Sequence, residues 1–308
     1  MASSASGQYQ YFASNYRGVP WEDEAPEYVW MHSALLLRAL GQVKPASVAA
    51  KLLEEHVEHS AACSIYFSNL VEEKGASLPA TMQLVNGVLH GANLAGMDLG
   101  SEGRESCREV TQHAAAYSYL HDQVVLSKQQ LSESVVLEAH NILMANMKRE
   151  DGLQVQAGAY RTGEASAGYH HFPPAFSVRP ALVWMLEQYN QRVQDLEEDP
   201  FVLSAWLSYE FVTIHPFDDG NGRMCRLLLS MVLLSRGVPF CSALGFASGH
   251  RRAKQHYMQC IKDAREHNGV ARRLAFVVLC SFRSAATSYF EALRMSAPDE
   301  YPSELKTW

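Results

Sequence analysis

The most informative segment of the chain runs from His215 to Arg226 and reads HPFDDGNGRMCR. It follows a mostly apolar run that ends at Ile214, and it leads into a second apolar run that continues to Arg236. A helix that is apolar on nearly every face is a central, buried helix. The pattern therefore predicts a loop between two core helices, together with the first turn of the second helix.

The residue types in this segment suit the binding of an anion at a helix start. The first backbone N–H groups of a helix have no internal partner and, with the helix dipole, form an anion site. Gly220 and Gly222 permit the close backbone approach that such a site needs, and Asn221 adds an amide donor. Arg223 and Arg226 are three positions apart, so both guanidinium groups share one helical face and can reach one polyphosphate.

Two further side chains of the segment can supply chemistry. Asp219 is the obvious carboxylate for a Mg²⁺ that phosphate oxygens also hold, and His215 can act as a general base at neutral pH. Each feature alone has an ordinary structural explanation, because a histidine before proline usually marks a helix end and paired arginines usually form a solvated face. Cations that open an apolar helix oppose its dipole, however, and so indicate an anionic partner.

The segment resembles the signature of the Fic family, His-x-Phe-x-Asp/Glu-Gly-Asn-Gly-Arg-x-x-Arg, without departure. The resemblance covers about residues 105–285 and includes three further stretches. VVLEAHNIL at 135–143 resembles an earlier core helix of the family. GAYR at 158–161, followed by Pro173 and Pro174, resembles its substrate flap, and HYMQCI at 256–261 resembles the helix that closes over adenine.

The resemblance implies a protein adenylyltransferase that moves AMP from ATP to a Ser, Thr or Tyr hydroxyl and releases pyrophosphate. His215 would deprotonate that hydroxyl, and Asp219 would coordinate Mg²⁺ on the phosphates. The flap, with Gly158, Tyr160 and Arg161, would align the target segment by adding it as a strand. The implied nucleotide-binding residues are Gly220, Asn221, Gly222, Arg223, Arg226 and Tyr257.

Many Fic proteins also carry an inhibitory helix with the pattern Ser/Thr-x-x-x-Glu-Gly/Asn. SNLVE, from Ser68 to Glu72, fits this pattern, but the next residue is Glu73 and not Gly or Asn. Acids in the last turn of a helix are disfavoured by about 0.3–1 kcal/mol, and a cation would relieve them. We expect Glu72 to contact Arg226 and inhibit transfer; the alternative is that both acids are solvated and offset by Lys74. In related enzymes this glutamate also supports removal of AMP, so de-AMPylation stays open.

Helical periodicity along the rest of the chain predicts an all-α protein, the mainly helical Fic fold, with a small β-hairpin flap near 155–172. Glycine and proline breakers mark the boundaries between segments. The predicted segments are an irregular N-terminus over 1–25, a helical N-terminal region over 26–104 with the inhibitory helix at about 57–74, the Fic catalytic domain over 105–294 and a tail over 295–308.

Composition narrows the class of protein. The 308 residues include 26 Lys and Arg against 33 Asp and Glu, a net charge of −7 that argues against a nucleic-acid partner. The six cysteines form no CxxC pair, which is typical of reduced thiols in the cytoplasm. Neither a signal peptide nor an apolar run of membrane-spanning length is evident. We therefore expect a cytoplasmic enzyme that uses ATP and Mg²⁺, acts on proteins with an accessible hydroxyl and contacts no membrane; a homodimer stays open.

Two other functions stay open at this stage. The segment from His215 to Arg226 would bind the phosphates and not the nucleobase, so another transferase of UMP or a similar group would carry the same residues. A nucleotide-sensing interaction protein with little catalysis belongs to a different class. A P-loop NTPase is excluded, because the sequence contains no Gly-x-x-x-x-Gly-Lys-Ser/Thr.

Overall fold

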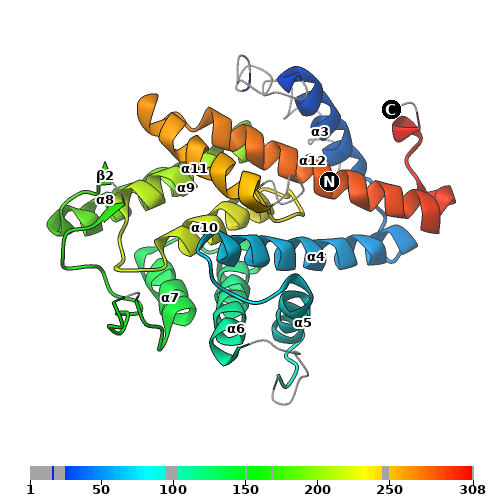
Figure 1. Ribbon diagram of the computed structural model, residues 1–308. Coiled ribbons are helices and arrows are strands. Elements are labelled where there is room, and N and C mark those ends of the chain that lie inside the picture. The colour runs from blue at the N-terminus through cyan, green and yellow to red at the C-terminus, as the bar shows by residue number, and fades with distance from the viewer. Residues whose placement is uncertain are drawn as a thin grey trace.

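The computed structural model describes residues 16, 25–94, 103–149, 151–167, 170–244 and 250–306, with the side chains of 250–253 left aside. Most of the predicted irregular N-terminus therefore lies outside the described residues. The regular structure is almost entirely helical (Figure 1), which confirms the predicted all-α class. The helices are α3 (Pro26–Leu40), α4 (Val48–Val71), α5 (Leu78–Leu89), α6 (Arg104–Leu120), the π-helical η1 (His121–Leu126), α7 (Glu133–Met144), α8 (Ala175–Arg192), α9 (Pro200–Ile214), α10 (Asn221–Ser235), α11 (His250–Glu266), α12 (Arg272–Ser296) and the short 3-10 helices η3 (Pro298–Glu300) and η4 (Ser303–Leu305).

A small hairpin is also present, as predicted. Strands β1 (Ser166–Ala167) and β2 (His170–His171) pair antiparallel, with Ser166 opposite His171. The hairpin is shorter than the predicted flap near 155–172, because the residues from Gly158 to Arg161 form a loop instead. The described part of the flap is therefore a long loop with a two-residue ladder at its outer end.

Helix α10 lies at the centre of the fold (Figure 1) and packs against α9, α4 and α6. Its residues from Arg223 to Leu233 are all buried, as the apolar pattern predicts. The buried apolar side chains of the described residues fall into two clusters that meet at this helix. Leu228 belongs to the cluster shared with α6, α7 and α8, while Leu229 belongs to the cluster shared with α3, α11 and α12.

Both clusters take residues from either side of position 104, where the sequence analysis divides the chain. Ile65 and Leu84 pack with the α6 and α7 side chains, and Leu36 and Phe67 pack with those of α12. Helix α4 lies beside α10 (Figure 1). It begins at Val48, so the inhibitory helix predicted at about 57–74 corresponds to the second half of a longer helix. The N-terminal region therefore shares its core with the catalytic region.

Part of the predicted tail over 295–308 is folded. Helices η3 and η4 follow α12, Leu305 is buried, and the Tyr301 ring packs edge-on against Phe290 at 6.3 Å. Apolar side chains in the last residues pack on α12 and α3, and the burial of this apolar surface holds the segment against the domain. Residues 307 and 308 lie outside the described part of the chain.

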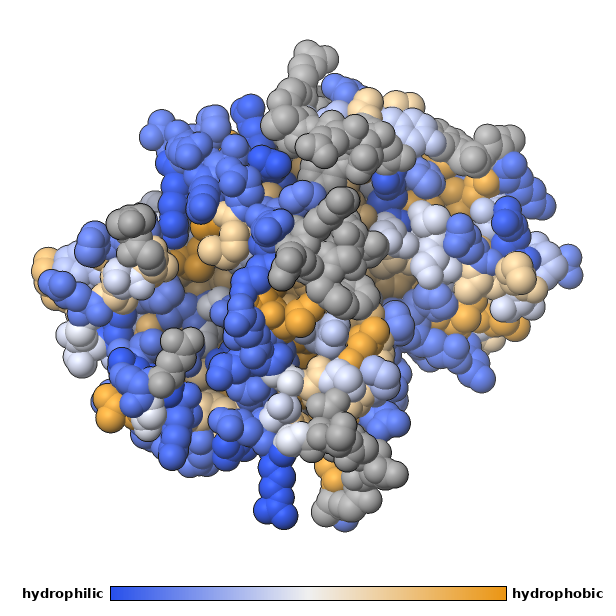
Figure 2. Space-filling view, in the orientation of Figure 1, coloured by the Kyte–Doolittle hydropathy of each residue, from blue (hydrophilic) through white to orange (hydrophobic). Residues whose placement is uncertain are grey.

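The surface of the described residues is mainly hydrophilic in the view of Figure 2, with apolar residues in small separate patches. Such scattered apolar residues are ordinary for a protein surface. None of the described helices is long and apolar enough to cross a membrane.

Candidate active site

The loop from His215 to Gly220 joins α9 to α10 and is bounded by two left-handed residues. His215 ends α9 with φ 51° and ψ 61°, and its N–H still bonds the Phe211 carbonyl at 3.0 Å. Gly220 begins α10 with φ 80°. A Cβ at Gly220 would lie 2.8 Å from Met144 Sδ, so only glycine fits both the backbone and the space. These two turns bring His215 back toward the start of α10.

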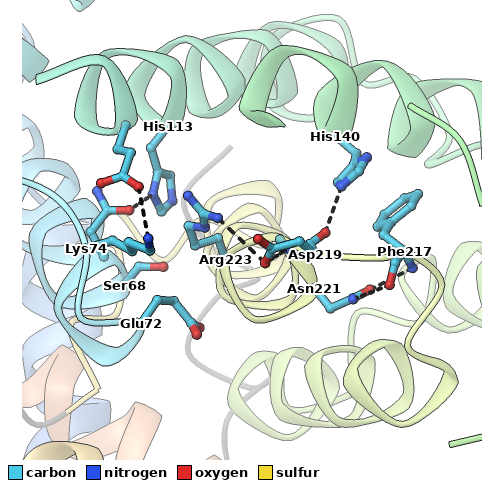
Figure 3. Close-up of polar contacts among 12 residues, drawn as sticks. Ser68, Glu72, Lys74, His113, His140, Phe217, Asp219, Asn221 and Arg223 are labelled. Carbon is cyan, nitrogen blue, oxygen red and sulfur yellow. Dashed lines mark hydrogen bonds and ion pairs between the residues drawn. The ribbon is translucent and has the colours of Figure 1, made fainter. Parts of the chain in front are cut away.

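Asn221 holds this loop closed. Its Oδ1 accepts from the Phe217 N–H at 2.9 Å, and its Nδ2 donates to the Phe217 carbonyl at 2.7 Å (Figure 3). The Phe217 ring is fully buried beneath. Asn221 was predicted to bind nucleotide, and the structure shows that both ends of its side-chain amide also bond Phe217 within the loop. The contact with nucleotide stays a prediction.

His140 of α7 links the loop to the flap, a role that the sequence did not reveal. Its Nδ1 accepts from the Gly158 N–H at 2.9 Å, and its Nε2 donates to the Asp219 carbonyl at 3.0 Å. The ring also stacks on Phe217, with centroids 3.6 Å apart. Burial lowers the pKa of His140 to about 4, so the ring is neutral and can accept and donate at once. A histidine on the inner face of a predicted core helix was the only available signal.

Arg223 and Arg226 are both buried at the start of α10, with side chains 4% and 3% exposed. Arg223 Nη2 lies 3.9 Å from Asp219 Oδ1, but its Nε and Nη1 are buried and have no hydrogen-bond partner among the described residues. Buried donors of a charged group are costly when unpaired. The unpaired Arg223 nitrogens therefore indicate an anion that completes the site.

Arg226 is held by the end of α4. Its Nη2 lies 2.5 Å from Glu72 Oε1 and 2.8 Å from the Ser68 carbonyl, and its Nε donates to Ser68 Oγ at 2.8 Å. The predicted pairing of Glu72 with Arg226 is thus present. Burial raises the pKa of Glu72, but the Arg226 guanidinium outweighs it and holds that pKa below its ordinary value. The pair is therefore charged at neutral pH.

The Glu72 carboxylate also covers the first turn of α10. A Cβ added at Gly222 would lie 2.2 Å from Glu72 Oε1. Figure 3 shows the Glu72 side chain reaching toward this turn, on the same side as Arg223. Because a helix start with free N–H groups attracts anions, Glu72 occupies a place that suits a phosphate group.

His215 stands at the entrance of the loop and is half-buried. The pKa of His215 is lowered to about 4, mainly by burial and in part by the nearby cations Arg161 and Arg265, while the Val212 carbonyl and Glu72 act in the opposite direction. The imidazole is therefore neutral at pH 7 and free to take a proton. Its ring stacks on Phe172, with centroids 3.7 Å apart and planes at 15°.

The flap residues predicted from sequence lie beside this histidine. The Arg161 N–H bonds the Pro216 carbonyl at 3.0 Å, and Arg161 Nε bonds the His215 carbonyl at 2.7 Å. The Tyr160 hydroxyl donates to Glu133 of α7 at 2.8 Å. With the Gly158 bond to His140, these contacts anchor the inner end of the flap on the loop and on α7.

Known proteins match this part of the chain. The model of the Fic/DOC family matches residues 130–233, which include the loop, the flap and His140. A Fido domain-containing protein of Dictyostelium discoideum is 31% identical over 149 residues, which are 47% of this chain and 99% of that protein.

The chain belongs to the Fic/DOC family.

Other Fic proteins extend the match. The protein adenylyltransferase fic-1 of Caenorhabditis briggsae is 28% identical over 233 residues, 67% of this chain and 42% of that relative. The chain thus spans less than half the length of this adenylyltransferase. A Fic domain-containing signaling protein of Bacteroides thetaiotaomicron has a crystal structure with a TM-score of 0.67 at 18% identity, covering 88% of this chain and 98% of the other. The likeness between these structures confirms the Fic fold.

Tyr257 of α11, which was predicted to contact the nucleotide, is buried. Its side chain is 3% exposed, and its hydroxyl lies 3.3 Å from Cys225 Sγ. The Arg226 guanidinium lies 5.6 Å from its ring centroid. Tyr257 therefore packs behind Arg226, and burial raises the pKa of its hydroxyl. A contact between adenine and Tyr257 stays a prediction that this burial does not favour.

The prediction of Mg²⁺ at the loop from His215 to Gly220 depends on one carboxylate. Asp219 is 39% exposed, and its Oδ1 also accepts from the Gly220 N–H at 2.6 Å. The described residues contain no group of three or more His, Cys, Asp or Glu that would form a protein cage for a metal. Mg²⁺ commonly uses one or two carboxylates together with substrate phosphates and water. An exposed carboxylate beside the unpaired Arg223 nitrogens fits that mode.

Proposed function

We propose that this Fic protein transfers AMP from ATP to the hydroxyl of a Ser, Thr or Tyr on a protein. The observation that carries the proposal is the start of α10, where Arg223 presents two buried nitrogens without a partner within the described chain and His215 lies at the entrance. Membership of the Fic/DOC family and likeness to a protein adenylyltransferase support it.

In the proposed reaction, His215 takes the proton of the target hydroxyl as the hydroxyl oxygen attacks the α-phosphorus of ATP. The bond from the α-phosphorus to the oxygen that bridges it to the β-phosphorus breaks, and pyrophosphate leaves with that electron pair. Burial keeps His215 neutral at pH 7, the protonation state in which its imidazole can accept a proton. The oriented N–H groups at the start of α10 face the charge on the phosphates, which is the main source of catalysis in such reactions.

Asp219 would hold Mg²⁺ together with the phosphate oxygens, and the ion would neutralise their charge. Arg223 and Arg226 would bind the β- and γ-phosphates, for which paired guanidinium groups are well suited. The flap would align the target segment as an extended strand. Positioning and charge neutralisation together account for catalysis of this kind.

We further propose that Glu72 inhibits transfer. It pairs with Arg226 at 2.5 Å and covers Gly222, so it competes with phosphate for both the cation and the helix start. Removal of Glu72 frees the site but leaves a buried Arg226 without its partner. ATP would then restore a negative charge to the same place.

The test is intact-mass analysis of Glu72→Gly protein incubated with Mg²⁺ and each nucleoside triphosphate. We expect an added AMP on the protein itself, at least about tenfold above the wild type, and its loss in the Glu72→Gly/His215→Ala protein. Glu73→Gln, a change in the neighbouring exposed acid, is the matched control and should stay at the wild-type level. ATP binding without any adduct in folded Glu72→Gly protein would contradict a transferase and favour a nucleotide sensor; an adduct from UTP alone would indicate a different transferase.

A further inference from the structure

The flap reaches His215 at two separate points. Arg161, at the inner end of the flap, bonds the His215 carbonyl, and Phe172, just after β2, stacks on the His215 ring. Arg161 also donates to the carbonyls of Gly163 and Pro173. One buried guanidinium therefore closes the flap at its base, and this base lies against the backbone of His215.

The His215 ring has only a weak orienting partner on its own helix. A catalytic histidine is commonly fixed by a hydrogen bond from its second nitrogen to a carboxylate or carbonyl. Here the Val212 carbonyl of α9 interacts with the ring and raises its pKa, but the buried Nδ1 makes no hydrogen bond of strict geometry within the described residues. The backbone at His215 is also left-handed, with φ 51°, which removes it from the rigid helix before it. The ring orientation therefore depends on packing as well as on Val212.

Phe172 provides that packing and is itself held. Its side chain is 9% exposed, and the His170 ring meets it edge-on at 4.9 Å. The Arg265 guanidinium of α11 lies 6.0 Å from the Phe172 centroid, within the range of a cation–π contact. The flap and α11 thus meet at Phe172, and the flat face of this ring rests on the imidazole.

We propose that Phe172 is a positioning residue that sets the orientation of the His215 imidazole, and that Arg265 holds Phe172 in place. The inference rests on the proposed role of His215 as the base of adenylyl transfer. It gives the flap a second task, because the same element that would align the target segment also orients the base that takes the target's proton. Loss of the flat ring would free the imidazole to rotate and admit water to it.

Charged groups around His215 come from three elements, and the Phe172 variants are compared with a Glu72→Gly parent that has the same charged groups as they have. Arg161 of the flap and Arg265 of α11 lower the pKa of His215, and Glu72 at the end of α4 raises it. Burial is the largest cause of the low pKa. Substitutions at Phe172 alter only the burial and the stack, so a change in the His215 titration after such a substitution reports on packing.

The experiment compares Phe172→Leu, Phe172→Met and Phe172→Tyr in the Glu72→Gly protein. The control is Phe176→Leu, a change in the 86% exposed ring of the next helix. The first readout is the titration of His215 by nuclear magnetic resonance of histidine-labelled protein, assigned with His215→Ala. The second is kcat and KM for ATP in self-labelling, and thermal unfolding checks that every variant is folded.

In Phe172→Leu and Phe172→Met we expect the pKa of His215 to rise by about one unit toward its ordinary value and kcat to fall about tenfold while KM for ATP changes less than about twofold. Phe172→Tyr keeps the ring and should stay near the parent in both readouts, as should Phe176→Leu. Arg265→Gln should lower kcat in the same direction as Phe172→Leu, but less; kcat alone is compared for this variant, because loss of the Arg265 charge raises the pKa of His215 by itself.

Unchanged titration and unchanged kcat in either folded non-aromatic variant would overturn the proposal. An equal loss in Phe176→Leu would overturn it too, because the effect would then be general destabilisation. If the Glu72→Gly parent shows no transfer at all, the proposed function fails, but the titration of His215 still decides whether Phe172 orients the ring.

Discussion

The Glu72 carboxylate rests on the Cα of Gly222, so closely that a Cβ there would lie 2.2 Å from Oε1. The same Cβ would lie 3.1 Å from Arg226 Nη1. One glycine therefore admits both the acid and the arginine to the first turn of α10. Any phosphate bound at this helix start would have to pass the same position.

Gly222→Ala is expected to destabilise the resting protein by about 1–3 kcal/mol, because its methyl group overlaps the Glu72 carboxylate. It should also weaken ATP binding, since the methyl group obstructs the start of α10. Equilibrium unfolding in urea and calorimetric titration with ATP measure the two effects.

The Gly222→Ala/Glu72→Gly protein separates these two causes. Without Glu72 the overlap disappears, so the two changes should be less than additive in the free energy of unfolding by about 1 kcal/mol or more. ATP binding should remain weak, because the methyl group is still present. Additive losses of stability would show that Glu72 does not occupy this turn in solution.

His140→Phe should loosen the link between the flap and the Fic loop. The new ring can still stack on Phe217, but the bonds to Gly158 and Asp219 are lost, each worth about 0.5–1.5 kcal/mol. We expect a loss of about 2 kcal/mol in urea unfolding and faster amide exchange at Gly158. His90→Phe, at an exposed helix end, is the control, and an equal loss there would refute the bridging role.

Protonation of buried histidines predicts that the fold weakens between neutral and mildly acid pH. Burial lowers the pKa of His140 and His215 to about 4 and that of His113 well below its usual range. Their folded-state pKa values lie below the ordinary 6.5, so the unfolded chain binds more protons between these values. The contribution of these neutral histidines to the free energy of unfolding is complete above about pH 6.5 and is lost as pH falls toward 4.

Urea unfolding at pH 7 and pH 5 measures this effect, in a window above the ordinary pKa of carboxyl groups. The fully buried His140 alone should account for a loss of about 2 kcal/mol at pH 5. The His140→Phe protein should lose correspondingly less between the two pH values. Equal stability of the wild type at both would contradict a neutral, buried His140.

Glu73 has a left-handed backbone with φ 58°, at the position where the family pattern has Gly or Asn. That conformation costs about 1–2 kcal/mol for an ordinary residue. The Glu73 ion pair with Lys254, at 2.8 Å, is exposed to solvent and therefore offsets little of this cost. Glu73→Asn should therefore raise the midpoint of thermal unfolding by a few degrees. Lys254→Ala removes the ion pair but keeps the left-handed Glu73, so a midpoint in Glu73→Asn no higher than in Lys254→Ala would contradict the strain.

Much of the site could be predicted because it is local in sequence. Residues from His215 to Arg226 lie within one loop and one helical turn, so helix geometry alone places the arginines on one face. The helical class and the central position of α10 follow from apolar periodicity. The hairpin was predicted too long, because glycines and aromatic residues in 155–172 suit loops as well as strands.

Contacts between distant segments could not be predicted in this way. Nothing in the sequence shows that His140 bridges Gly158 and Asp219, or that the Asn221 side-chain amide hydrogen-bonds Phe217. The burial of Tyr257 depends on how α11 packs behind Arg226, which no local pattern specifies. Stacking of Phe172 on His215 likewise requires the flap to fold back on α9.

The contact between Glu72 and Arg226 shows most clearly what the sequence determined and what the tertiary structure decided. The sequence by itself determined which groups are available: a base, a carboxylate, two arginines at a helix start and an acid at a helix end. The family pattern favoured Glu72 as the partner of Arg226, but only the tertiary structure decided that the contact forms and that the acids are not both solvated, because α4 ends at Val71 beside α10 and the chain turns left-handed at Glu73. That turn leaves Glu72 over Gly222 and carries Glu73 outward to Lys254. The local pattern thus identifies the acid, and the packing of α4 beside α10, which no local pattern specifies, brings that acid to the helix start.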